Sequence, residues 1–220
     1  MKKIIILLSL VVFFTGSAFA CPNLQVYIPG ATYDASSETW VTAEHTNFEV
    51  WVIAAKLDKG AIYDVTLVAA LMGETPVDGA LEITPDGGST VIYGADDYTL
   101  GTPPTAGDDD DPNLPPHGIY PTNYVEMLAA SVTTLNPYPV QNYVPDGDGG
   151  TSLYGQIFKF NVTTTYDVVH FDAFGYYKDA DGKLIKAPFS HDGETSVPEP
   201  ATLLLFGIGL GAGYLRKKFK

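Results

Sequence analysis

The stretch Asn47–Ala55, Asn-Phe-Glu-Val-Trp-Val-Ile-Ala-Ala, decides the fold class of this chain. Apolar residues alternate along it, so one face of an extended strand would carry Phe48, Val50 and Val52. Residues 63–71 repeat the pattern and would place Val65, Leu67 and Ala69 on one face. Both stretches therefore predict β-strands with a buried face.

Shorter β-rich runs surround these two stretches and are separated by Gly, Pro and Asp. They cover residues 24–28, 39–42, 80–84, 90–93, 157–162 and 166–177. No helical period is sustained between residues 21 and 196, and residues 123–130 could form two helical turns at most. Short strands between turns are typical of sandwiches, so we expect an all-β, antiparallel β-sandwich of the jelly-roll or Ig-like kind.

Two segments of the body read as connections. Residues 100–123 are rich in Pro, Gly and Asp and predict a mobile or ligand-bound loop. Residues 179–183 contain Asp-Gly between two β-rich runs, which favours a hairpin turn.

The charge of the chain is concentrated between residues 21 and 200. All 26 acidic residues and only six lysines lie there, a net charge of about −20. Such a surface repels phosphate backbones, which argues against nucleic acid as a partner, and it attracts cations such as Ca²⁺.

The first twenty residues predict a secretory signal peptide. Lys2 and Lys3 precede an apolar run over residues 4–14, and Ala18-Phe19-Ala20 forms a small-x-small cleavage site. The expected partners are the Sec export machinery and signal peptidase. Cleavage would leave Cys21, the only cysteine, at the mature N-terminus, which raises lipidation as an alternative, although Ala18 and Phe19 depart from a lipobox.

Residues 197–220 form a second targeting segment. It begins with Val197 and the tripeptide Pro198-Glu199-Pro200, and an uncharged apolar run follows over residues 201–215. A basic tail closes it, with Arg216, Lys217, Lys218 and Lys220. As a helix the apolar run would be about 22 Å long, short against a hydrocarbon core of about 30 Å. The alternative is an ordinary C-terminal membrane anchor.

This tripeptide, helix and basic end resemble the PEP-CTERM protein-sorting signal of Gram-negative bacteria. The resemblance implies recognition by exosortase, a membrane-embedded cysteine transpeptidase, and cleavage close to Pro198-Glu199-Pro200. It also implies a transient stay in the inner membrane, followed by transfer to the cell surface or extracellular matrix. The expected organisation is then a signal peptide over 1–20, a β-sandwich body over 21–196 and a sorting signal over 197–220.

The body resembles the choice-of-anchor N proteins, exported bacterial proteins in which the C-terminal anchor varies. The segments that carry the resemblance are 33–42, 116–122, 169–174 and 188–192. The resemblance implies architecture and location, and no chemistry.

A catalytic or metal site would have to come from the histidines and their acidic neighbours. His117, His170 and His191 lie in the segments just named, near Asp172 and Asp192, and a fold could bring them together. Their spacing matches no catalytic motif, so the sequence predicts no enzyme, and His170 is expected to be a half-buried, hydrogen-bonded strand residue.

Calcium is the ligand that the acidic clusters favour, and no other cofactor is expected. Carboxylates gather at Asp108, Asp109, Asp110 and Asp111, and again at Asp146 and Asp148. Neither cluster completes an EF-hand loop, and Asp179 and Asp181 fit the hairpin turn better than a calcium site.

The sequence thus predicts an exported, non-catalytic protein with a structural or adhesive role in the exopolysaccharide layer. The alternative class is a carbohydrate-binding protein or a metal-dependent extracellular enzyme. Aromatic residues could stack on sugars, yet Trp40 and Trp51 are expected to be core residues.

Overall fold

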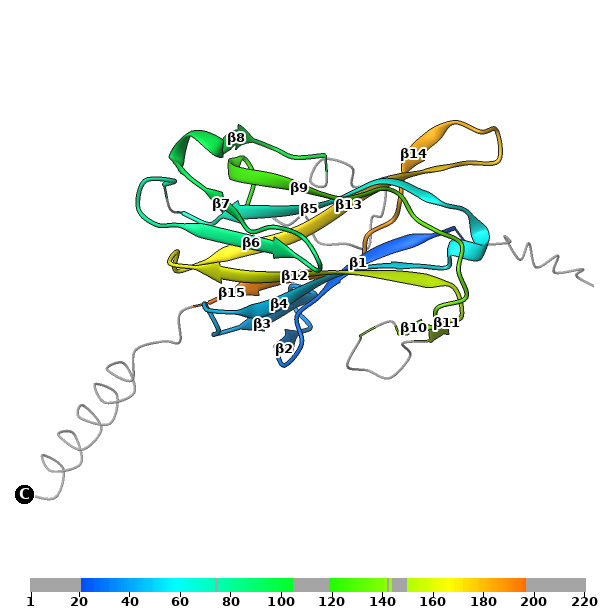
Figure 1. Cartoon of the computed structure of the whole chain (residues 1–220), viewed down its shortest axis with the longest axis horizontal. Helices are drawn as coiled ribbons and strands as arrows, with labels where there is room; N and C mark the ends of the chain where they lie inside the picture. Colours follow the sequence, from blue (N-terminus) through cyan, green and yellow to red (C-terminus); the bar gives the residue numbers. More distant parts are fainter. Residues whose placement is uncertain (1–20, 74, 105–118, 142, 144–149, 197–220) are drawn as a thin grey trace, which may run out of the picture.

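Two β-sheets packed face to face make up most of the computed structural model (Figure 1). The structure describes residues 21–73, 75–104, 119–141, 143 and 150–196. Within them the predicted all-β sandwich is confirmed.

The smaller sheet has five strands, each antiparallel to its neighbour. Their order across the sheet is β1 (Asn23–Tyr27), β4 (Phe48–Ala55), β12 (Gly155–Thr164), β6 (Leu81–Pro85) and β7 (Val91–Tyr93).

The larger sheet has eight strands. Seven follow the order β2 (Thr32–Asp34), β3 (Thr39–Thr42), β15 (Asp192–Thr195), β13 (Val169–Lys178), β5 (Ile62–Leu71), β9 (Thr122–Val132) and β8 (Thr99–Gly101). The eighth, β14 (Leu184–Lys186), pairs with β13. All pairs are antiparallel except β15 with β3, which is parallel.

Short elements complete the described fold. A two-stranded ribbon joins β10 (Val140–Gln141) and β11 (Thr151–Ser152), and 3-10 turns cover Leu57–Lys59 and Ala95–Asp97. Strand β1 links the two layers, because its Leu24 N–H donates to the Pro188 carbonyl and its Val26 N–H to the His191 carbonyl, each at 2.8 Å.

The core lies between the sheets and contains the faces that alternation predicted. Phe48, Val50 and Val52 of β4 are buried in it, and so are Val65, Leu67 and Ala69 of β5. Phe48 and Phe171 meet across the layers with ring centroids 6.0 Å apart. Burial of this apolar surface is the main source of folding free energy.

One stretch that the sequence left open to helix is strand. Residues 123–130 lie within β9, which pairs with β5 from Tyr63↔Val132 to Leu71↔Asn123. Val125 and Met127 are buried there while Glu126 and Leu128 are exposed, so the burial follows a period of two. Pairing with the core strand β5 overrides a local pattern that was ambiguous.

The predicted hairpin turn at residues 179–183 is confirmed. The Asp179 N–H donates to the Lys183 carbonyl, and the Asp179 Oδ1 accepts the N–H groups of Asp181 and Lys183 at 3.0 and 2.9 Å. Gly182 supplies the positive φ of 77° that the turn requires. The Asp179 carboxylate is thus committed to the turn.

Several predictions concern residues outside those described. They are the signal peptide with Ala18 and Ala20, the calcium clusters at 108–111 and 146–148, and the tail with its helix over 201–215. Among the described residues, no helix has the length and apolar character needed to cross a membrane.

Candidate functional site

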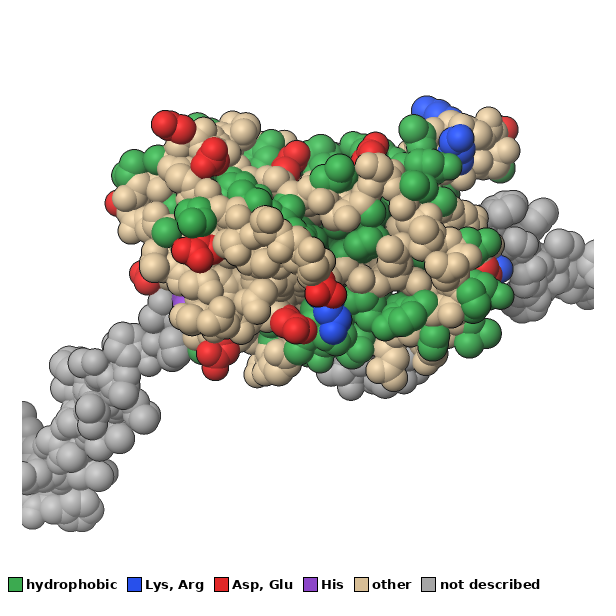
Figure 2. Space-filling model, viewed as in Figure 1, with side chains coloured by type: hydrophobic (Ala, Val, Ile, Leu, Met, Phe, Trp, Pro, Cys, Tyr) green, Lys and Arg blue, Asp and Glu red, His purple; other side chains and the backbone are tan. Residues whose placement is uncertain are grey.

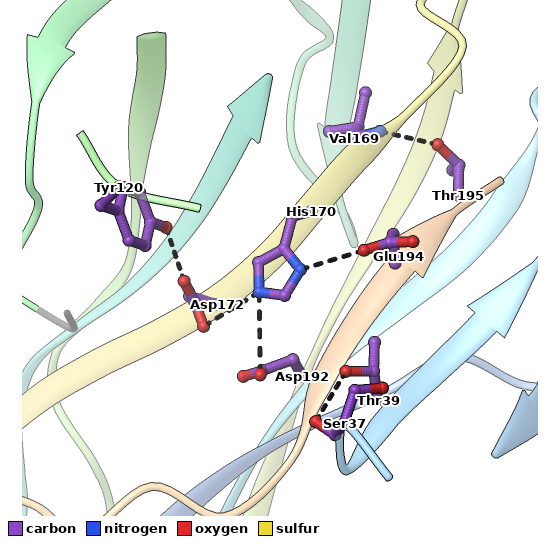
Figure 3. Close-up of polar contacts among 9 residues, drawn as sticks. All are labelled: Ser37, Thr39, Tyr120, Val169, His170, Asp172, Asp192, Glu194 and Thr195. Carbon is purple, nitrogen blue, oxygen red and sulfur yellow. Dashed lines mark hydrogen bonds and ion pairs between the residues drawn. The ribbon is translucent and has the colours of Figure 1, made fainter. Parts of the chain in front are cut away.

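Four ionisable side chains meet on the outer face of the larger sheet, where β13 lies beside β15. The antiparallel register pairs His170 with Glu194 and Phe171 with Gly193. Phe171 is buried in the core between the sheets, so its neighbours His170 and Asp172 point to the opposite face. The same alternation on β15 sends Asp192 and Glu194 to that face, and Figure 3 shows the four side chains together.

The imidazole of His170 lies at the centre of this group (Figure 3). Its Nε2 is 3.6 Å from Asp172 Oδ1 and 3.7 Å from Asp192 Oδ2, and its Nδ1 is 3.5 Å from Glu194 Oε2. The His170, Asp172 and Asp192 side chains are 5%, 0% and 2% exposed, while Glu194 is 23% exposed. We call these four residues the His170 cluster.

Neighbouring residues hold the His170 cluster in place. The Tyr120 hydroxyl donates to Asp172 Oδ2 at 2.6 Å, which orients that carboxylate with Oδ1 toward His170. On the other side, Thr195 Oγ1 accepts the Val169 N–H at 2.9 Å and fastens β15 to β13. Asp192 also pairs in register with Thr39 of β3, so three strands fix the geometry.

Burial and neighbouring charges shift the pKa of His170 in opposite directions. Burial by itself lowers the pKa of its imidazole, since the charged form loses water. The Asp172 carboxylate acts most strongly in the other direction, helped by Glu194 and Asp192, and the pKa ends well above its ordinary value. The cluster is therefore a site that attracts positive charge.

Of the histidines that the sequence grouped, His170 lies with the two aspartates. His170 joins Asp172 and Asp192 as the sequence allowed, although it is almost fully buried instead of half-buried. The His191 ring contacts Ser190 and Tyr33, with its Nδ1 2.8 Å from Ser190 Oγ and its centroid 5.5 Å from that of Tyr33. His117 lies outside the described residues.

Sequence reasoning missed Glu194 and Tyr120 as members of this site. A signal for Glu194 existed, because His170-x-Asp172 and Asp192-x-Glu194 both carry ionisable residues at the spacing of one strand face. No comparable signal existed for Tyr120, which lies 52 residues before its partner Asp172 in the sequence.

A second group of functional residue types lies on the outer face of the smaller sheet. The registers pair Tyr27 with Trp51 and Trp51 with Lys159, so one row crosses β1, β4 and β12. The Tyr143 ring stacks on Tyr27 with centroids 3.9 Å apart. We call Tyr27, Trp51, Tyr143 and Lys159 the aromatic row.

Polar contacts fix the tryptophan of this row. Its Nε1 donates to Glu49 Oε2 at 2.6 Å, and the Lys159 ammonium lies 4.3 Å from its ring centroid. Trp51 packs against a small cluster outside the main core, so its prediction as a core residue was wrong, whereas Trp40 does pack against the core. Side chains alternate between the two faces of a strand, and Phe48, Val50 and Val52 take the inward positions of β4. The Trp51 side chain therefore points outward.

An open polar groove of about 310 Å³ adjoins the aromatic row. Its polar side chains include Glu49, Asp86, Lys159 and Asn161. In Figure 2 this side of the molecule shows acidic and basic side chains next to apolar ones. The face thus combines aromatic rings with hydrogen-bonding groups.

The location of the protein is decided at its C-terminal end. Residues 196–218 match the PEP-CTERM protein-sorting motif. This is an exported protein that exosortase sorts, and it is anchored or processed at the membrane of a Gram-negative bacterium. The predicted PEP-CTERM signal is confirmed, and the choice-of-anchor resemblance of the body stays a prediction.

Comparison with curated proteins found no match. Among solved structures, AvmM, which catalyzes macrocyclization in alchivemycin A biosynthesis, has 12% identity, a TM-score of 0.32, and coverage of 78% of this chain and 84% of its own. The collagen-binding domain of a Staphylococcus aureus adhesin has 11% identity, a TM-score of 0.24, and coverage of 83% and 99%. The collagen-binding subdomain of the Enterococcus faecalis surface protein ACE has 10% identity, a TM-score of 0.21, and coverage of 72% of this chain and 93% of its own. Values this low transfer no ligand or activity to this chain.

Proposed function

We propose that this protein is a non-catalytic component of the cell surface or extracellular matrix that holds polysaccharide on the outer face of its smaller sheet. The sorting motif supports this location. The observation that carries the ligand is the aromatic row beside the polar groove. Lys159 belongs to both, because it lines the groove and its ammonium lies over the Trp51 ring.

The chemistry of this face suits a sugar chain. Pyranose rings present C–H faces that pack on aromatic rings and hydroxyls that hydrogen-bond at their edges, and large amphipathic rings contribute contact area at interfaces. The groove offers both acceptors and donors, from Glu49, Asp86, Asn161 and Lys159. A row across three strands matches an extended ligand better than a compact one, because adjacent strands lie about 4.8 Å apart.

A catalytic role is less well supported by the described residues. The His170 cluster carries the strongest acid–base chemistry there, yet His170, Asp172 and Asp192 are almost fully buried. A substrate needs access to the reacting groups within hydrogen-bond reach. Burial of this kind favours a structural role for the cluster.

Co-sedimentation with polysaccharide isolated from the producing strain tests the proposal. We expect the Trp51→Ala variant to bind about tenfold more weakly, which corresponds to about 1.4 kcal/mol. The matched control is Tyr176→Ala, an aromatic change on the larger sheet, which should leave binding unchanged. Equal binding by wild type, Trp51→Ala and Lys159→Ala would contradict the assignment of this face.

A further inference from the structure

We propose that His170, Asp172 and Asp192 form a structural binding site for one divalent transition-metal ion, with Zn²⁺ as the preferred occupant, and that Glu194 and Tyr120 position its ligands. This inference is independent of the polysaccharide proposal. It rests on distances, burial and charge within the His170 cluster.

Distances within the His170 cluster suit a bound ion. The 3.6 and 3.7 Å separations of His170 Nε2 from Asp172 Oδ1 and Asp192 Oδ2 are long for hydrogen bonds. They suit two ligands of one ion, because atoms each about 2.0–2.1 Å from Zn²⁺ lie about 3.3 Å apart in a tetrahedron and at most about 4.1 Å apart. The three ligand atoms lie within 4.8 Å of one another, so a bound ion would draw the two carboxylates slightly together.

The other imidazole nitrogen of His170, Nδ1, faces Glu194. Histidine ligands generally donate their second ring N–H to a carboxylate or carbonyl, which fixes the tautomer and the ring orientation. Glu194 Oε2 lies on that side of the ring, 3.5 Å from Nδ1, which is an ion-pair distance that a small shift would shorten to a hydrogen bond. Nε2 is thereby directed at the two aspartates, and Tyr120 orients Asp172 through its other oxygen.

The buried carboxylates of the cluster also favour a cation. Asp172 and Asp192 are 0% and 2% exposed, and two buried carboxylates side by side are costly unless positive charge compensates them. A divalent ion between the two carboxylates would place positive charge next to both of them.

The donor set selects the metal. One imidazole with two carboxylates suits Zn²⁺ or its transition-metal neighbours, whereas Ca²⁺ and Mg²⁺ prefer oxygen ligands alone. The aspartates and the histidine are buried and come from two paired strands of the sandwich. The ion would therefore link β13 to β15 and stabilise their pairing.

The test uses the full chain purified in detergent, stripped with EDTA and titrated with ZnCl₂ by calorimetry. We expect one tight equivalent, and X-ray absorption should show one imidazole and oxygen ligands with no sulfur. Asp172→Asn and Asp192→Asn keep the side-chain shape and should each weaken Zn²⁺ binding at least about 100-fold. Glu194→Gln and Tyr120→Phe should weaken it by about 10–100-fold.

Two control variants separate this site from other carboxylates. Asp64→Asn removes an exposed carboxylate on β5, and replacement of Asp108, Asp109, Asp110 and Asp111 by Asn removes the acidic run. Both should retain the tight equivalent. Absence of tight binding to the folded, unaltered chain would overturn the proposal, as would a sulfur ligand or tight binding that survives Asp172→Asn and Asp192→Asn. The spectroscopic result on the unaltered chain decides the matter even where a variant fails to fold.

Discussion

His170 and Glu194 are direct cross-strand partners, with His170 Nδ1 3.5 Å from Glu194 Oε2 on the outer face of the larger sheet. This relationship leaves the other imidazole nitrogen facing Asp172 and Asp192. It ties the orientation of one buried ring to a carboxylate that is still 23% exposed.

The first prediction is that Zn²⁺ stabilises the fold through this cluster. At free Zn²⁺ of about 100 times Kd, binding should add about 2.7 kcal/mol to the free energy of unfolding. For a domain of this size that corresponds to a rise in Tm of about 5–10 °C. Differential scanning calorimetry of EDTA-stripped protein, with and without Zn²⁺, measures it, and Asp192→Asn should lose most of the rise.

A second prediction concerns close packing at Gly155. A Cβ there would lie 2.6 Å from Val140 Cγ1 and 2.9 Å from the Ala54 carbonyl oxygen. Gly155→Ala should therefore lower the free energy of unfolding by about 1–3 kcal/mol, measured by urea denaturation. Gly150→Ala is the matched control, because nothing lies within 4 Å of its added Cβ. Equal stability of the two variants would show that β12 and β10 do not pack as described.

The third prediction concerns the core between the sheets. Phe171 is 0% exposed and contacts Phe48 across the layers. Phe171→Ala should cost about 3–5 kcal/mol of unfolding free energy. The control is Leu100→Ala, since Leu100 is 73% exposed and its loss should change stability by less than about 0.5 kcal/mol.

A fourth prediction follows from the turn at Asp34. Its Oδ1 accepts the hydroxyl and the N–H of Ser36 at 2.7 and 2.8 Å, and these bonds lower the pKa of the Asp34 carboxyl below its ordinary value. A lowered pKa stabilises the fold above the unfolded value of about 4, and the contribution disappears as pH falls through the folded pKa. Carboxyl ¹³C NMR should show the Asp34 midpoint rising in Ser36→Ala. An unchanged titration midpoint would show that the Ser36 hydroxyl does not lower the pKa of Asp34.

Alternation made much of the sandwich predictable from sequence. The buried faces of β4 and β5 and the turn at Asp179 each follow from residues close together in the chain. Strand β9 was left open to helix because its state depends on pairing with β5, which no local pattern reports. Trp51 was assigned to the core for a related reason. The identity of a large apolar residue does not show whether its side chain points to the inner or the outer face of the sheet.

The His170 cluster was only half predictable. Its histidine and two aspartates could be named as ionisable residues in neighbouring segments, but their meeting requires the register of β13 with β15. Tyr120 joins through a contact between residues 52 positions apart. Long-range pairing of this kind is set by the whole fold, so the site becomes visible only when the sheet is assembled.

The central claim is that the C-terminal motif delivers this β-sandwich to the cell surface, and the localisation of a truncated chain tests it most directly. Wild type and a variant lacking residues 197–220 would be expressed in a host that carries exosortase, with immunoblotting of inner-membrane, surface and released fractions. We predict that wild type reaches the surface or matrix fraction and that the truncated chain is lost from it. Unchanged surface display of the truncated chain would contradict the account.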